Sequence, residues 1–297
     1  MALLRWGTMD VPNHRSSHAV PVVRSGGIAT LLGASVASIL TRRRPDRVQG
    51  TAVLALAGLG LADDVSGDVP ASLRLATQLT FGAAPSAHDG LDRPLAGVVT
   101  AGVVNVVNFM DGINGITGMT AAVWGVNAML LQDESDGDLG TLGALTAGAG
   151  LGFLPHNVPT ARMFLGDVGS YAFGAAMAAG ILSQRSVAGR YRAAAPLMVY
   201  GVDATQALLR RAYAGEPLTE PHRGHIYQRL VDGGWSHLEV AVLHAVLAGI
   251  VAASSHRGRV VASIVGLTVA VGYLTLPTSS PTHAGRPTSS PIIEREL

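Results

Sequence analysis

Seven long stretches of the sequence contain no Asp, Glu, Lys or Arg, and this feature limits the possible folds most strongly. Several of them approach the roughly 20 residues that an α-helix needs to cross a bilayer. One such stretch could be a buried helix of a soluble protein, but seven cannot be buried in a chain of 297 residues. We therefore expect an integral membrane protein. The stretches are Ser25–Thr41, Pro94–Met110, Gly112–Gln132, Leu139–Ala161, Val168–Gln184, Val240–His256 and Val260–Gly285.

The composition agrees with a membrane protein and excludes several kinds of chemistry. Only 14% of the residues are charged and the mean hydropathy is +0.35, which lies outside the usual range of soluble domains. A formal net charge of +1 with scattered basic residues gives no basis for binding nucleic acid. All 21 basic residues are Arg and Cys is absent, so Lys-dependent phosphate loops, Schiff bases, thiolate catalysis and disulfides are excluded. Met1–Asp10 has no apolar core, so we expect no cleavable signal peptide.

The apolar segments predict an all-α polytopic bundle of about ten transmembrane helices. We expect residues 1–276 to form this membrane domain and residues 277–297 to be a disordered cytoplasmic tail, because the tail repeats PTSSP and cannot bury a core. The numbers of Arg on the two sides are too similar to decide the orientation. The predicted spans are 26–41, 48–62, 73–84, 94–109, 113–132, 139–155, 168–184, 193–209, 238–254 and 260–276.

Because successive spans cross in alternate directions, the connecting segments fall on two faces. One face receives nearly all the residues suited to chemistry, in segments 1–25, 63–72, 109–112, 156–167 and 210–237. We therefore expect one face of the membrane to carry an active site formed by loops.

The segment DVPNHRSSHAVPVVRSGG, residues 10–27, is rich in Arg and His. Arg15, His18 and Arg24 are candidates for binding phosphate oxygens, because guanidinium groups hold them with two hydrogen bonds. Taken alone, the segment is equally consistent with a loop that anchors lipid headgroups.

Two adjacent carboxylates, Asp63 and Asp64, directly follow an apolar span in LADDVSGD. Two neighbouring anions repel each other beside a low-dielectric layer, so a divalent metal or a proton-transfer role would explain them. A solvated helix cap is the alternative.

The segment NVVNFMDGINGITG, residues 105–118, repeats polar residues every three positions. Asn108, Asp111 and Asn114 at membrane depth are costly unless they bind a ligand or line a cavity. Amide hydrogen bonds between packed helices are the alternative.

Two further segments complete the set of chemical motifs. Asp167 lies in FLGDVGS at the start of a span, and Asp is both a good ligand for hard metals and a good N-cap. His222, Arg223 and His225 cluster in PHRGHIYQRL. A His and Arg cluster on the same face as four acids indicates an anionic ligand held between a metal and cations.

In this order, the five segments resemble the polyprenyl-phosphate N-acetylhexosamine-1-phosphate transferases of glycosyltransferase family 4, which include phospho-N-acetylmuramoyl-pentapeptide transferase and the GlcNAc-1-phosphate transferases. Each motif alone is weak, whereas five in order on one face are specific. The resemblance implies a multi-pass enzyme of the bacterial inner membrane with a cytoplasmic active site. It also implies that a UDP-N-acetylated sugar donates its sugar 1-phosphate to polyprenyl phosphate with release of UMP, initiating a cell-envelope polysaccharide.

The same resemblance implies roles for individual residues. The catalytic set is Asp63, Asp64, Asp111, His222 and His225, and the metal, Mg2+ with Mn2+ as an alternative, is held by Asp167 with Asp64 or Asp111. We expect Asp63 to deprotonate or orient the lipid phosphate. A two-step route through a phosphorylated Asp stays open. The substrate-binding set is Asn108, Asn114, Arg223, Arg15, His18 and Arg24.

Two positions depart from the family pattern. Relatives usually have a further transmembrane helix before the first motif, whereas nine residues precede Asp10 here, so we expect that helix to be absent. Asn114 stands where many relatives have Asp, which changes the hydrogen bonds offered to the uracil. A homodimer is a candidate assembly. A CDP-alcohol-type phosphotransferase and a non-catalytic lipid-linked sugar transporter or scaffold are the alternative functions.

Overall fold

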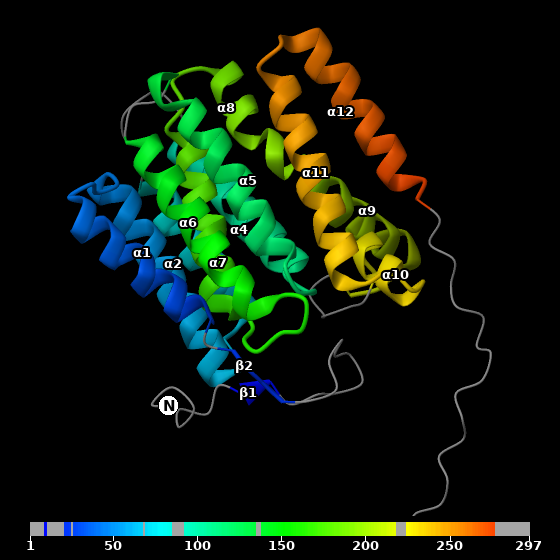
Figure 1. Cartoon of the computed structure of the whole chain (residues 1–297), viewed down its shortest axis with the longest axis horizontal. Coiled ribbons are helices and arrows are strands. Elements are labelled where there is room, and N and C mark those ends of the chain that lie inside the picture. The colour runs from blue at the N-terminus through cyan, green and yellow to red at the C-terminus, as the bar shows by residue number, and fades with distance from the viewer. Residues whose placement is uncertain are drawn as a thin grey trace, which may run out of the picture.

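The computed structural model describes residues 9–10, 21–24, 26–67, 69–84, 92–134, 138–217 and 224–276. In this part the chain is a helical bundle, with a single antiparallel pair of two-residue strands, β1 and β2, at one end (Figure 1). The elements are β1 (Met9–Asp10), β2 (Val22–Val23), α1 (Gly26–Thr41), α2 (Arg47–Ser66), α3 (Ala71–Ala83), α4 (Arg93–Met110), α5 (Ile116–Leu130), η3 (Gln132–Glu134), α6 (Leu139–Asn157), α7 (Gly166–Leu182), α8 (Val187–Ala194), η4 (Ala195–Leu197), α9 (Met198–Ala214), α10 (Ile226–Asp232), α11 (His237–Ser255) and α12 (Arg259–Leu274).

The predicted all-helical membrane architecture is confirmed. Three helices, α2, α4 and α11, are long and apolar enough to cross a membrane, and α1, α5 and α12 are shorter apolar helices. The number of crossings stays a prediction, as does the disordered tail, which lies outside the described residues.

One predicted span has a different local structure. Residues 193–209 do not form one continuous α-helix, because the 3-10 turn η4 separates α8 from α9. Pro196 lies in this turn and has no backbone N–H to donate, so the α-helical hydrogen bonds are interrupted there.

The helix ends that carry the chemical motifs lie together. The C-terminal ends of α2 and α4 and the N-terminal end of α7 point toward the side of the bundle where β1 and β2 lie, while α8 and the turn between α11 and α12 lie at the opposite end (Figure 1). This arrangement agrees with the alternation of segments predicted from the sequence.

Helices α2 and α7 pack closely at the motif end. A Cβ atom on Gly60 of α2 would lie 2.2 Å from the Asp167 carbonyl oxygen and 2.7 Å from the Val168 nitrogen. No side chain fits there without moving one helix, because real Cβ contacts are longer. One turn away, Leu56 of α2 packs with Val104 of α4 in a fully buried cluster that also includes Tyr171 and Ala175 of α7. The three helices are therefore fixed relative to one another close to Asp63, Asp111 and Asp167.

We predict that Gly60→Ala lowers the thermal stability of the protein in detergent by several degrees, because the added methyl group forces α7 away from α2. Gly58→Ala is the matched control, since a Cβ at Gly58 meets nothing within 4 Å. In the interior of a helix Ala is favoured over Gly by about 1 kcal/mol, so the control should melt at the same or a slightly higher temperature. Equal melting temperatures for the two variants would show that the close approach of α2 and α7 is not needed for stability.

Candidate active site

Four carboxyl groups from three helices converge at the motif end of the bundle. Asp63 and Asp64 lie in the last turns of α2, Asp111 is the C-cap of α4, and Asp167 is in the first turn of α7. The negative charges of Asp167 and Asp64 act on the Asp111 carboxyl group, and those of Asp64 and Asp63 act on Asp167. The structure therefore brings all four predicted acids together at one end of the bundle.

The Asp64 carboxylate caps the N-terminus of α7. Its Oδ1 and Oδ2 atoms accept hydrogen bonds of 3.0 Å from the backbone N–H groups of Asp167 and Val168. The N-cap residue itself, Leu165, has no side chain that can accept a hydrogen bond, so Asp64 satisfies donors that would otherwise lack partners. Asp64 thereby positions Asp167.

The turn before α7 needs glycine for two reasons. Gly166 has φ +73°, a conformation that L side chains rarely adopt. A Cβ there would also lie 2.6 Å from Asp64 Oδ2 and from the carbonyl oxygen of Arg24. Any larger residue would displace the Asp64 carboxylate from its hydrogen bonds.

The N-terminal motif segment reaches this site through β2. Phe164 donates a backbone hydrogen bond of 2.8 Å to the Val23 carbonyl oxygen, and Gly27 donates one of 2.7 Å to the Leu165 carbonyl oxygen. Arg24 follows β2 and attracts the Asp64 carboxylate electrostatically. Arg24 thus lies beside the acids, and its binding of phosphate stays a prediction. Arg15 and His18 lie outside the described residues.

Asp167 and Asp63 face each other. Asp167 Oδ1 accepts a 2.9 Å hydrogen bond from Asn108 Nδ2, which also donates to Ser170 Oγ at 3.0 Å. The Asp167 carboxyl group lies close enough to that of Asp63 for the two to share a proton. Two carboxylates in such contact repel each other unless a proton or a cation lies between them.

A residue that the sequence analysis missed neutralises Asp63. Arg74 of α3 forms a 2.8 Å ion pair with Asp63 Oδ2, and its guanidinium group lies beside the Tyr171 hydroxyl. The sequence does contain a feature that could have identified this residue. Arg74 is the single charge in the apolar segment 73–84, and a charge in such a segment is costly without a partner.

The remaining predicted residues lie at the edges of this cluster. Asn114 donates a 3.2 Å hydrogen bond from Nδ2 to the Pro159 carbonyl oxygen, so it is held by the loop between α6 and α7. His225 is buried, and its Nδ1 lies 3.1 Å from Oδ1 of Asp203 of α9, within hydrogen-bond distance. The sequence analysis did not select Asp203. The ring centroid of His225 lies 6.4 Å from that of Phe109, near the end of α4. His222 and Arg223 lie outside the described residues.

The hydrogen bonds of the four acids determine which of their oxygens could hold the predicted metal ion. Within the described ranges, no group of three or more His, Asp or Glu side chains is arranged to hold a metal ion. Both Asp64 oxygens already bind backbone N–H groups. Both Asp63 oxygens also accept hydrogen bonds, from the Val69 N–H at 3.3 Å and from Arg74 at 2.8 Å. Asp167 and Asp111 remain as the hard oxygen donors of the cluster. A donor set of this kind fits Mg2+, which often uses only one or two carboxylates together with substrate phosphates and water.

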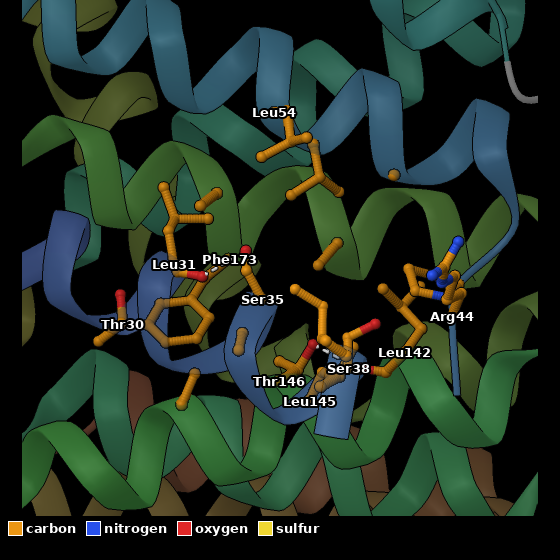
Figure 2. A pocket seen from close by; sticks show the side chains of 18 residues that line it. Thr30, Leu31, Ser35, Ser38, Arg44, Leu54, Leu142, Leu145, Thr146 and Phe173 are labelled. Atoms are coloured by element: carbon orange, nitrogen blue, oxygen red, sulfur yellow. Dashed lines mark hydrogen bonds between the residues drawn. The ribbon is translucent and has the colours of Figure 1, made fainter. Parts of the chain in front are cut away.

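An apolar pocket of about 330 Å³ lies between α1, α2, α6 and α7. Its lining includes Leu31, Leu54, Leu142 and Phe173, and Arg44 is the one charged side chain among the described lining residues (Figure 2). None of the four clustered acids lines it. The pocket is therefore separate from the acidic site, and its lining suits a hydrocarbon group rather than a nucleotide.

Comparison with known proteins now decides the family. The model of glycosyl transferase family 4 matches residues 48–184, which include Asp63, Asp64, Asp111 and Asp167. A decaprenyl-phosphate N-acetylglucosaminephosphotransferase of Mycolicibacterium smegmatis is 30% identical over 84% of this chain and 75% of its own length. The chain belongs to glycosyl transferase family 4.

Other members of the family are also similar over most of the chain. The decaprenyl-phosphate N-acetylglucosaminephosphotransferase of Mycobacterium leprae is 31% identical over 81% of this chain and 74% of its own length. A probable undecaprenyl-phosphate N-acetylglucosaminyl 1-phosphate transferase of Bacillus subtilis is 26% identical over 82% of this chain and 75% of its own length. The family predicted from the five motifs is therefore correct.

We predict that the stability of the protein in buffer without divalent cations falls as the pH rises toward 8, in part through Asp111. Burial, followed by the charges of Asp167 and Asp64, raises the pKa of Asp111 from 3.8 to about 8. Between these values the folded protein holds a proton that the unfolded chain has released, so raising the pH favours unfolding. Above the raised pKa this stabilisation of the folded state by the proton is lost.

The measurement is the melting temperature from pH 5 to about pH 8.5 for the native protein and for Asp111→Asn, whose amide does not titrate. The variant should lose less stability over this interval than the native protein. Parallel curves would contradict the raised pKa.

Proposed function

We propose that the protein transfers N-acetylglucosamine 1-phosphate from UDP-N-acetylglucosamine to a polyprenyl phosphate. An oxygen of the lipid phosphate forms a bond to the β-phosphorus, the bond from that phosphorus to the UMP oxygen breaks, and polyprenyl-diphosphate-N-acetylglucosamine and UMP leave. The convergence of four acids at one end of a membrane bundle of this family carries the proposal. The printed names of its relatives support the choice of donor and acceptor.

Both substrates are anions, so the site must reduce the repulsion between them. When bound, Mg2+ supplies positive charge to the diphosphate oxygens. We place it at Asp167, with Asp111 as the second acid, and assign Asp63 to the lipid phosphate. Asp64 then acts through its hydrogen bonds to the start of α7, which hold Asp167 in place. Arg24 is a candidate for binding phosphate oxygens from the N-terminal side.

Asp63 is the acid best placed to receive a proton or orient the lipid phosphate. Its Oδ2 is paired with Arg74, so the carboxylate is held in one orientation. A phosphate monoester has a second pKa near 6, so part of the lipid carries the proton that Asp63 would remove at neutral pH. The double-displacement alternative would need the same carboxylate to attack phosphorus.

We propose that the motif end of the bundle faces the cytoplasm, where UDP-sugars are made, and that about ten segments cross the bilayer. The acceptor reaches the site from within the membrane, so its hydrocarbon chain stays among the apolar helices. A homodimer stays a prediction.

The assay that tests the function measures UMP release by the purified protein with UDP-N-acetylglucosamine and decaprenyl phosphate. We predict that Asp167→Asn abolishes activity, because an amide keeps the shape but lacks the charge that a hard cation needs. Asp138→Asn is the control, since Asp138 caps α6 through Thr141 at the opposite end of the bundle and Asn is also a good cap. Absence of UMP from the native protein with all UDP-sugars would favour a transporter or scaffold.

A second prediction separates proton transfer from charge pairing at Asp63. Asp63→Asn should lower the rate by about 10²–10⁴ with little change in UDP-sugar affinity, and the loss should shrink as the pH rises above about 6. Arg74→Gln is the matched variant, because it breaks the same ion pair but leaves the carboxylate. If both variants lose the same activity at every pH, Asp63 serves to pair with Arg74 and is not the base.

A further inference from the structure

A buried carboxylate outside the acidic cluster organises the other half of the motif face. Asp203 of α9 is 0% exposed, and its two oxygens accept four hydrogen bonds. Oδ1 accepts from His225 Nδ1 at 3.1 Å and from the backbone N–H of Ile226 at 3.0 Å. Oδ2 accepts from the backbone N–H of Tyr227 at 3.1 Å and from the Tyr273 hydroxyl at 2.6 Å. An isolated carboxylate in an apolar bundle is costly, and these donors offset that cost.

The contact with Asp203 determines the tautomer of His225. A carboxylate can only accept hydrogen bonds, so the proton of the neutral imidazole must be on Nδ1. Nε2 is then the nitrogen that can take up a proton or, once protonated, donate one to a phosphate oxygen. If the Asp203 carboxylate were removed, the hydrogen bond that favours the proton on Nδ1 would be lost.

The same carboxylate links α10 to the end of α4. Its hydrogen bonds to the first two N–H groups of α10 fix the start of that helix, and the Tyr227 hydroxyl donates a 3.0 Å hydrogen bond to the Phe109 carbonyl oxygen. A Cβ atom on Gly112 would clash with the Tyr227 hydroxyl oxygen, so the backbone at residue 112 and the Tyr227 side chain are in direct contact beside Asp111.

On the other side, Asp203 contacts a purely structural pair. The Tyr273 hydroxyl donates to Asp203 and lies 3.0 Å from His244 Nε2, which therefore donates to it. Tyr273 and His244 are both buried, on α12 and α11. They join these helices to α9 and have no contact with α4 in this network.

We propose that Asp203 is a positioning residue for catalysis: it holds His225 as the Nδ1–H tautomer, with Nε2 as the proton-exchanging atom toward substrate phosphate, and fixes through Tyr227 the end of α4 that carries Asp111. The proposal rests on the proposed function, in which His225 acts on the phosphate groups. It explains why a full set of donors surrounds a carboxylate that lies outside the cluster of four acids.

The test uses the full chain in detergent, labelled with [15N]histidine. NMR distinguishes the two imidazole tautomers, and the His225 signal is identified by its loss in His225→Gln. The native protein should show the Nδ1–H form at His225. Asp203→Asn, whose amide can donate as well as accept, should increase the Nε2–H form and lower kcat about 10- to 100-fold, with the KM for UDP-N-acetylglucosamine within about threefold of the native value.

Three companion variants separate positioning from stability. Tyr273→Phe removes one donor from the same carboxylate without touching His225 or α10, so it should keep the tautomer and lose less activity than Asp203→Asn. Tyr227→Phe should lower kcat without changing the tautomer, because it breaks the link to Phe109 and leaves the contact between Asp203 and His225 Nδ1 in place. If Asp203→Asn does not fold, Asp203→Glu, which keeps the charge, should retain the Nδ1–H form with a reduced kcat.

The outcomes distinguish this inference from the proposed function. An Nε2–H form in the native protein, an unchanged tautomer in folded Asp203→Asn, or equal losses of kcat in Asp203→Asn and Tyr273→Phe would overturn the positioning role. If the native protein shows the Nδ1–H form, and Asp203→Asn shifts it, but no UMP is released from any UDP-sugar, the proposed function fails while the hydrogen-bonded arrangement stands.

Discussion

The hydrogen bonds from the Asp64 carboxylate to the first N–H groups of α7 hold the candidate site together. They join the end of α2 to the start of α7 and place Asp167 opposite Asp63. This junction depends on Gly60 and Gly166, whose missing side chains leave room for it. A helix N-terminus also attracts negative charge, so the junction favours anions where several must meet.

The charges around this junction show how a membrane bundle tolerates four acids at one end. Backbone N–H groups donate hydrogen bonds to Asp64, Arg74 pairs with Asp63, and Asn108 donates to Asp167. Arg74 offsets only part of the repulsion between the Asp63 and Asp167 carboxylates, and a proton or a cation between them would remove the rest. The surrounding partners are fixed by packed helices, so this pair is where a change in bound charge has the largest effect.

Long apolar segments predicted the helical membrane fold, because an α-helix needs about 20 such residues to cross a bilayer. The acids of the candidate site could be selected because carboxylates at membrane depth are costly and therefore rare, and their order along the chain indicated the family. The motif LADDVSGD alone does not distinguish Asp63 from Asp64, and their different expected roles came from the family resemblance. Adjacent residues differ by about 100° around a helix. Asp64 therefore accepts hydrogen bonds from the start of α7, whereas Asp63 pairs with Arg74 of α3. Arg74 and Asp203 were missed because their partners are distant in sequence and known only from the packing.

The acidic cluster and the His segment meet at the end of α4. This end of the helix contacts both halves of the motif face and therefore positions them relative to each other. Asp111 is electrostatically coupled to Asp167 and Asp64 on one side, while Phe109 accepts the hydrogen bond from Tyr227 on the other. The two sides use the same device, because Asp64 and Asp203 each accept hydrogen bonds from the first N–H groups of a helix, α7 and α10. Each carboxylate thereby fixes a neighbour to which the proposed reaction assigns a role, Asp167 or His225. Since α4 contacts both arrangements, a movement of its C-terminal turn would change the distance between the acids and His225, and the close contact of Gly112 with Tyr227 opposes such a movement.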